Sequence, residues 1–153
     1  MQTVSEILTP ARTVCHASGS SKKKLFETIA KVISDDQPSM PHDEVFAQLI
    51  AREKLGSTGL GQGIAIPHCR VSHCTEPLGT LLTLEVPVDF EAPDDLPVDL
   101  LFVLLVPEEA HQRHLDILAG IARLFSQAEF CARLRAATDS QELYDIATGS
   151  GEQ

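Results

Sequence analysis

The sequence predicts one compact domain of the α/β class. Helical and extended hydrophobic patterns alternate along its 153 residues, as they do in chains that pack helices against a sheet. The segment Val98–Val106, VDLLFVLLV, is almost continuously apolar, which is typical of a central strand covered on both faces. Hydrophobic residues make up 43% of the chain, enough for a single core at this length. We therefore expect one domain over residues 1–153, with residues 149–153 as a flexible tail.

The N-terminal segment predicts a turn, a short strand and a long helix. Val4–Leu8 forms a short apolar turn that Pro10 ends, and Thr13–Cys15 is a brief β segment. The segment Gly19–Ser21 offers an N-cap for the helix, which ends at Asp35–Pro38. The apolar stripe of this helix is Leu25, Phe26, Ile29, Val32 and Ile33.

The middle of the chain predicts a second helix and then three strands. Pro41 suits the first turn of this helix, and Lys54 lies near its end. Its buried side consists of Val45, Phe46, Leu49 and Ile50. The expected strands are Ile64–Ile66, Gly79–Val86 and Val98–Val106, and Pro87–Pro97 is an acidic connection between the last two.

The C-terminal part predicts three helices. The first runs roughly from Ala110 to Phe125, and the second covers Glu129–Arg135. Thr138–Gln141 matches a capping box, which places the start of the third helix, Glu142–Ala147.

Charge and composition limit the partners and the compartment. The chain has 22 acidic and 12 basic residues, and its net charge of −10 disfavours nucleic acid and anionic membranes. The basic run Lys22–Lys24 is short enough to be a solvated helix face. The chain has neither a basic and apolar leader nor an apolar run of 18 residues, so we predict a cytoplasmic protein without membrane insertion. Its cysteines, Cys15, Cys69, Cys74 and Cys131, are then expected to be free thiols.

A glycine-rich segment, Gly56–Gly63, resembles a phosphate-binding loop only in composition. It follows a helix and precedes a strand, which is the reverse of the order in nucleotide-binding folds, and it lacks the spacing of their motifs. We interpret it as a loop that needs positive φ angles, with free N–H groups that could line a small anion site. No cofactor is predicted.

Two groups of residues offer metal ligands. His68, Cys69, His73 and Cys74 supply the donors that zinc prefers, but adjacent residues of an extended segment point to opposite sides. Glu108, His111 and His114 share one helical face, yet a di-iron bundle needs two such motifs. The sequence therefore predicts no metal site, and a metal-binding module stays as a distant alternative.

Two kinds of nucleophile remain in the segment Pro67–Cys74, PHCRVSHC. Cys69 or Cys74 would need a cation and a base, and sequence neighbours alone do not supply that geometry. His68 follows the rigid segment Ile64–Pro67, at the end of a strand, where an imidazole is firmly held and reachable. An imidazole nitrogen suits phosphoryl transfer, for which Arg52 could supply a guanidinium and His114 a second ring.

The segment Arg52–His68, REKLGSTGLGQGIAIPH, resembles the active-site segment of the fructose/mannitol-type enzyme IIA domains of the bacterial phosphoenolpyruvate-dependent phosphotransferase system. Within that family the likeness is greatest to the nitrogen-regulatory branch. Three later blocks resemble the same family: VDLLFVLLVP, HLDILAGIARLF and CARLRAATDSQELYDI. The resemblance implies a mixed β-sheet with helices on both faces, which agrees with the α/β pattern.

The resemblance also implies roles for individual residues. His68 matches the histidine that an HPr-type phosphocarrier protein phosphorylates, Arg52 the arginine beside the phosphoryl group, and His114 the second active-site histidine. Ser57 is expected to donate a hydrogen bond to the phosphoryl group. Cys69 stands where many relatives have glycine.

The function implied is that of a phosphohistidine carrier and regulator in nitrogen-related phosphotransfer. Its partners would be an HPr-type carrier (NPr) and regulatory targets such as transporters or kinases. A sugar-specific enzyme IIA that passes the phosphoryl group to a IIB domain is the alternative. In either case the chain is a covalent phosphotransferase component, and an oligomer is compatible with the sequence.

Overall fold

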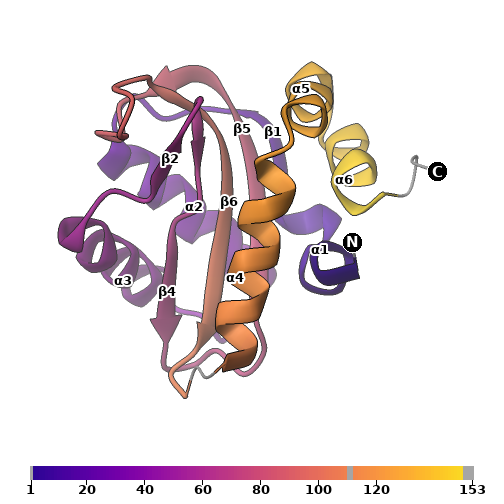
Figure 1. The fold of residues 1–153 in the computed structure, drawn as a ribbon. Helices are drawn as coiled ribbons and strands as arrows, with labels where there is room; N and C mark the ends of the chain where they lie inside the picture. The colour runs from indigo at the N-terminus through magenta and orange to yellow at the C-terminus, as the bar shows by residue number, and fades with distance from the viewer. Residues whose placement is uncertain (1, 110–111, 150–153) are drawn as a thin grey trace.

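The structure, a computed structural model, describes residues 2–109 and 112–149, with the side chains described from residue 4 onward. Six strands within these residues form one sheet in the order β1-β5-β6-β3-β2, with β4 also paired to β6 (Figure 1). The strands are β1 (Thr13–Ala17), β2 (Gly59–Gly61), β3 (Ile64–Ala65), β4 (His68–Val71), β5 (Leu78–Val88) and β6 (Val98–Pro107). β5–β6 and β2–β3 are antiparallel pairs, whereas β1–β5, β3–β6 and β4–β6 are parallel. The predicted α/β class and the mixed sheet are confirmed.

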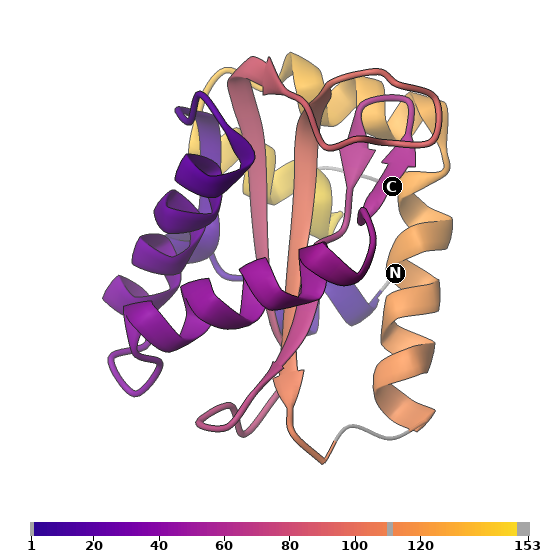
Figure 2. The same cartoon turned by 90° about the vertical axis from the view of Figure 1, so that its left-hand side faces the viewer.

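Helices cover both faces of this sheet. They are α1 (Gln2–Ile7), α2 (Lys22–Asp36), α3 (His42–Leu55), α4 (Gln112–Phe125), α5 (Ala128–Ala136) and α6 (Ser140–Thr148), with a 3₁₀ turn at Pro10–Arg12. Helices α2 and α3 lie on one face, and α1, α4, α5 and α6 lie on the other (Figures 1 and 2). None of the helices among the described residues is long and apolar enough to cross a membrane.

The central strand β6 explains why both faces are covered. Leu101, Val103 and Leu105 belong to the apolar core beneath α2 and α3. Leu100, Phe102, Leu104 and Val106 belong to the second core, beneath α1, α4, α5 and α6. Because successive side chains of a strand point to opposite faces, a continuous apolar run supplies both cores. The predicted central position of this strand is confirmed.

Several predicted boundaries agree with the structure, and others differ for local reasons. Ser21 is the N-cap of α2, as expected, and its hydroxyl accepts from the Lys24 N–H at 3.2 Å. Most of the predicted turn Val4–Leu8 is instead helical, because α1 extends to Ile7. The N-cap of α6 is Asp139, one residue after the predicted Thr138. Its side chain accepts from the Glu142 N–H at 2.8 Å.

Two short strands lie where loops were expected. Strand β2 occupies part of the glycine-rich segment and pairs with β3, with positive φ angles at Gly61, Gln62 and Gly63 closing the hairpin. Strand β4 begins at His68, so this histidine opens a strand and does not follow the end of one. Strand β4 pairs with β6, which is distant in the sequence, and strand β2 is too short to show an alternating pattern. The described part of the chain does not include residues 110, 111 and 150–153. His111, considered above as a metal ligand, and most of the expected tail therefore lie outside it.

Strands β3 and β4 run along one side of β6 and are separated by Ile66 and Pro67. The pair Ala65↔Leu101 closes one ladder, and His68↔Leu104 opens the next. Proline has no N–H to donate to a ladder, so the edge is interrupted there while the Pro67 carbonyl still accepts from the Leu104 N–H at 2.9 Å. His68 is the first residue of the ladder after this interruption, and it lies between α3 and α4.

Candidate active site

A cavity of about 430 Å³ lies between α3, α4 and the edge formed by β4 and β6. It is lined by Arg52 and Leu55 from α3, His68 from β4, and His114 and Leu115 from α4, among others. Three residues predicted from the sequence, Arg52, His68 and His114, therefore face one cavity although 62 positions separate the first from the last. Buried apolar side chains of β6, including Leu104, form part of its wall.

The ring of His68 is held in one orientation by the backbone of its own segment. Nδ1 lies 2.7 Å from the Ile66 carbonyl oxygen, and a carbonyl can only accept a hydrogen bond. Nδ1 is therefore the nitrogen that carries the proton, and in the neutral ring the lone pair is on Nε2. His68 is half-buried and lines the cavity, so it combines a fixed ring with a nucleophilic nitrogen.

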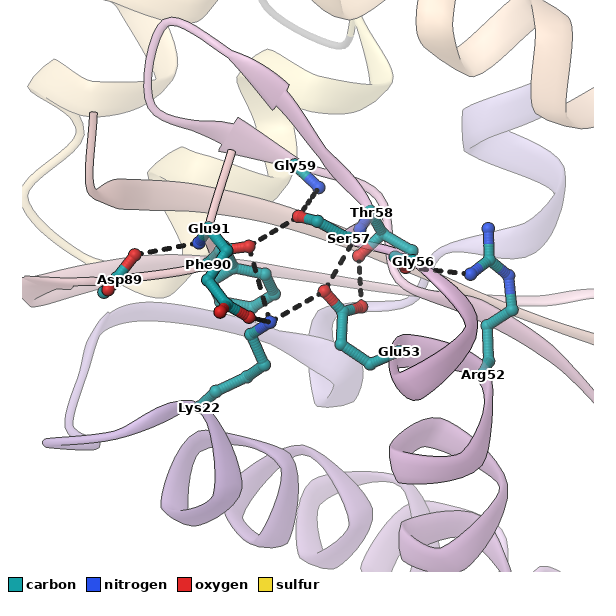
Figure 3. A network of polar contacts seen from close by, with 10 residues as sticks. All are labelled: Lys22, Arg52, Glu53, Gly56, Ser57, Thr58, Gly59, Asp89, Phe90 and Glu91. Carbon is teal, nitrogen blue, oxygen red and sulfur yellow. Dashed lines mark hydrogen bonds and ion pairs between the residues drawn. The ribbon is translucent and has the colours of Figure 1, made fainter. Parts of the chain in front are cut away.

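Arg52 lies in the last turn of α3, where a cation interacts favourably with the helix dipole. Its Nη1 donates to the Gly56 carbonyl oxygen at 3.0 Å, which holds the side chain over the end of its own helix (Figure 3). A guanidinium has five N–H donors in a planar arrangement that matches phosphate oxygens, so further donors are available to a ligand.

His114 reaches the cavity from the first turn of α4. The residue is half-buried, and its Nδ1 is buried with no hydrogen-bond partner within the described part of the chain. The His114 ring thus adds a second imidazole to the cavity beside His68, and its Nδ1 is available for a hydrogen bond.

Ser57 is not among the residues that line the cavity. Its hydroxyl donates to the Phe90 carbonyl and accepts from the Gly59 N–H at 3.0 Å (Figure 3). The structure accordingly assigns Ser57 to the loop after α3, and its predicted hydrogen bond to a phosphoryl group stays a prediction.

The four potential zinc ligands do not converge on one point in the described part of the chain. Cys69 packs in the core beneath α2 and α3, the Cys74 thiol donates to the Glu76 carbonyl at 2.9 Å, and His73 Nδ1 pairs with Glu44 at 2.9 Å. Among residues 2–109 and 112–149, no three His, Cys, Asp or Glu side chains are placed to hold a metal ion.

The same burial disfavours a cysteine nucleophile. Burial raises the pKa of Cys69 to about 12 and that of Cys74 to about 11, with the neighbouring Cys74 adding to the effect at Cys69. The thiolate is the reactive form of cysteine, so both groups are inert near neutral pH.

Two further features of the site were not predicted. Glu53 is buried next to Arg52, where it pairs with Lys22 and accepts two hydrogen bonds from Thr58. An acidic residue in the last turn of a helix opposes the helix dipole, and this is the sequence signal that could have marked it.

The second feature is an exposed apolar rim, formed by Leu55 (84% exposed) and Leu115 (60%), on opposite sides of the cavity.

Comparisons with known proteins agree with this fold. The family model of the phosphoenolpyruvate-dependent sugar phosphotransferase system EIIA 2 matches residues 6–148. The nitrogen regulatory protein of Pseudomonas aeruginosa is 50% identical over 141 residues, which cover 92% of each chain. The crystal structure of the nitrogen regulatory protein IIA-Ntr from Neisseria meningitidis superposes with a TM-score of 0.88 at 42% identity, over 95% of this chain and 99% of that one. The crystal structure of IIA mannitol from Escherichia coli shares the fold, with a TM-score of 0.73 at 17% identity over 91% and 97% of the two chains.

The chain therefore belongs to the EIIA 2 family of the phosphoenolpyruvate-dependent sugar phosphotransferase system. Within it, the relatives in Pseudomonas aeruginosa and Neisseria meningitidis are both named as nitrogen regulatory proteins.

Proposed function

We propose that this protein is a cytoplasmic phosphohistidine carrier and regulator of nitrogen-related phosphotransfer. In this proposal, His68 accepts a phosphoryl group from the phosphohistidine of an HPr-type carrier. The observation that carries it is the common cavity of His68, Arg52 and His114, with Nδ1 of His68 bonded to a carbonyl and Nε2 left with its lone pair. The names of the relatives support the regulatory branch.

The transfer exchanges one phosphorus–nitrogen bond for another. The lone pair of His68 Nε2 attacks phosphorus, the bond to the carrier's ring nitrogen breaks, and that nitrogen recovers its electron pair. As the new bond forms, positive charge develops on the His68 ring. The Ile66 carbonyl stabilises this charge because it accepts from Nδ1–H at 2.7 Å.

The neighbouring groups act on the phosphoryl oxygens. The Arg52 guanidinium neutralises the negative charge that is shared by the oxygens in the transition state. The His114 ring faces the same cavity and can donate a proton in a hydrogen bond to an oxygen.

Partners reach the site across its apolar rim. Leu55 and Leu115 offer apolar surface on the two sides of the cavity, and covering them removes water from around the phosphoryl group. Regulatory targets, such as transporters or kinases, would then distinguish the free from the phosphorylated form, because two negative charges are added at the centre of this surface.

Phosphorylation by a purified phosphocarrier tests the proposal. The protein is expected to take up one acid-labile, alkali-stable phosphate, and His68→Ala is expected to remove it. Labelling that persists in His68→Ala would reject the assignment. If the labelled protein passed its phosphate to a sugar-specific IIB domain and sugar became phosphorylated, the sugar-transport alternative would replace the regulatory one.

A further inference from the structure

We infer that Glu53 is a positioning residue that sets the orientation of the His68 ring, an inference that rests on the proposed phosphorylation of His68. Glu53 does not line the cavity and does not touch the reacting atoms. It acts through Thr58 and Ile66, by hydrogen bonds that lead to Nδ1 of His68.

The first step joins Glu53 to Thr58. The Glu53 side chain is buried, and its Oε1 accepts from the Thr58 hydroxyl at 2.7 Å. Oε2 accepts from the Thr58 N–H at 3.1 Å and pairs with Lys22 Nζ at 3.0 Å (Figure 3). Two of these three donors belong to Thr58, so the carboxylate fixes both its side chain and its backbone.

The second step joins Thr58 to His68. The Thr58 carbonyl accepts from the Ile66 N–H at 3.1 Å, and the Ile66 carbonyl accepts from His68 Nδ1–H at 2.7 Å. The N–H and the carbonyl of Ile66 belong to successive planar peptide groups that meet at its Cα, so the bond to Thr58 anchors the residue whose carbonyl accepts from His68. Displacement of Thr58 would move the acceptor that selects the Nδ1–H form of the ring.

The same carboxylate also fixes the end of α3 from which Arg52 extends. Arg52 and Glu53 are adjacent, and Figure 3 shows their side chains pointing to different sides of the helix end. Lys22, the first residue of α2, pairs with Glu53. Its Nζ also donates to the Phe90 carbonyl at 3.4 Å and lies 4.9 Å from the centre of the Phe90 ring. Glu53 therefore links α2, α3 and the loop after α3 at one point.

The chemistry of Glu53 favours a positional role over a purely space-filling one. A buried carboxylate loses its hydration, and at a helix C-terminus it also opposes the dipole. An apolar side chain would fill the volume without either cost, but it could not direct Thr58. The three directional contacts are what an apolar side chain could not supply here.

The test compares Glu53→Ala with Glu53→Gln. In Glu53→Gln the amide oxygen can accept from the Thr58 N–H while its NH₂ donates to the Thr58 hydroxyl oxygen, so the link is kept. Glu53→Ala loses it. Two measurements are needed: the protonated nitrogen of His68 in the unphosphorylated protein, by ¹⁵N NMR of the ring, and the single-turnover rate of phosphorylation.

The wild-type ring is expected to carry its proton on Nδ1 and the Glu53→Gln ring to do the same. Glu53→Ala is expected to give a mixture of Nδ1–H and Nε2–H rings and a phosphorylation rate lower by roughly 10- to 100-fold, the size of effect that misplacement by about 1 Å produces. Glu44→Ala is the matched control. Glu44 is also a carboxylate of α3 with three contacts, to Ser72 and His73, but it lies at the opposite end of the helix. This control is expected to leave the His68 ring unchanged.

A Glu53→Ala protein that is folded, with the wild-type ring form and the wild-type rate, would overturn the inference. If Glu53→Ala does not fold, Glu53→Asp replaces it, since the shorter carboxylate cannot reach both Thr58 donors; an unchanged ring in that variant is equally contradictory. The ring measurement needs no phosphate. It therefore decides the inference even if wild-type protein is not phosphorylated, an outcome that would reject the proposed function alone.

Discussion

At the scale of the residue, the reactivity proposed for His68 depends on a single backbone acceptor. The Ile66 carbonyl selects the Nδ1–H form of the ring, which leaves Nε2 as the nucleophile. That acceptor is available because Ile66 faces away from β6, as the bond from its N–H to the Thr58 carbonyl shows. The neighbouring Pro67 carbonyl is the one that accepts from β6, through the Leu104 N–H at 2.9 Å, so the Ile66 carbonyl is not needed in that ladder.

Arg52 is predicted to stabilise the transition state of the transfer. Arg52→Ala should lower the single-turnover rate of phosphorylation by about 10²- to 10³-fold, the usual cost of removing one donor from a developing negative charge. Arg52→Lys should recover only part of the loss, because an ammonium does not reproduce the planar donors. Rapid-quench kinetics at saturating carrier measure the effect, with the exposed Arg123→Ala as control. An Arg52→Ala rate equal to that of the control would contradict this role.

The buried thiols predict how stability changes at alkaline pH. Burial raises the pKa of Cys69 from 9.0 to about 12, so between these values the unfolded chain has lost a proton that the folded chain keeps. Stability must then fall as pH rises above about 9, with a slope of about 1.4 kcal/mol per pH unit for this thiol. Cys74 adds a similar slope up to about pH 11.

Urea unfolding at several pH values measures this slope. Between pH 9 and 11, Cys69→Ala should be less steep than wild type, although its absolute stability is lower because a small cavity is left. Equal slopes for the two proteins would show that the Cys69 thiolate is tolerated in the fold.

The site residues divide into those that the sequence could reveal and those that it could not. His68, Arg52 and His114 belong to motifs with a familiar order, and the structure gathers them at one cavity. The role of Glu53 depends on Lys22, 31 positions earlier, and on a loop conformation that no local pattern specifies. Ser57 lies within the motif but bonds to Phe90, a contact that only the folded chain reveals.

At the scale of the element, long amphipathic segments were predictable and short strands were not. Helices α2 and α3 follow from their apolar stripes, and strand β6 follows from its almost continuous apolar run. Strands β2 and β4 have three and four residues, and they exist because β3 and β6 offer hydrogen-bond partners. Tertiary contacts, rather than local preference, therefore produced the strand on which His68 lies.

The cap of α6 provides a test at this scale. Asp139 accepts from the Glu142 N–H, and Glu142 in turn accepts from the Thr138 N–H at 2.9 Å. Asp139→Ala should lower the free energy of unfolding by about 1 kcal/mol, the typical value of an N-cap. Chemical denaturation measures it. Thr138→Val is the informative comparison: a loss larger than that of Asp139→Ala would restore Thr138 as the principal cap.

At the scale of the whole molecule, the surface combines a strong negative charge with an apolar rim at the site. The net charge of −10 favours approach of a partner whose face is basic, and salt should weaken that approach. Leu55 and Leu115 then supply apolar contact around the cavity, from α3 and α4. The sheet with its two layers of helices sets these residues on opposite sides of His68.

Removal of the apolar rim should affect docking and not chemistry. Leu115→Glu is expected to raise KM for the phosphorylated carrier by about tenfold or more, as loss of a buried apolar anchor does, with little change in kcat. The exposed Val86→Glu, on β5, is the matched control because it adds the same charge away from the cavity. If both variants raised KM equally, added charge rather than the rim would explain the effect.

The central claim is that Nε2 of His68 receives the phosphoryl group while Nδ1 keeps its proton. The most direct measurement is ¹H–¹⁵N NMR of the histidine rings after phosphorylation by the carrier, with His68→Ala used to assign the signals. We predict phosphorus coupling at Nε2 of His68 alone. Phosphate on Nδ1 of His68, or on another residue, would contradict the account.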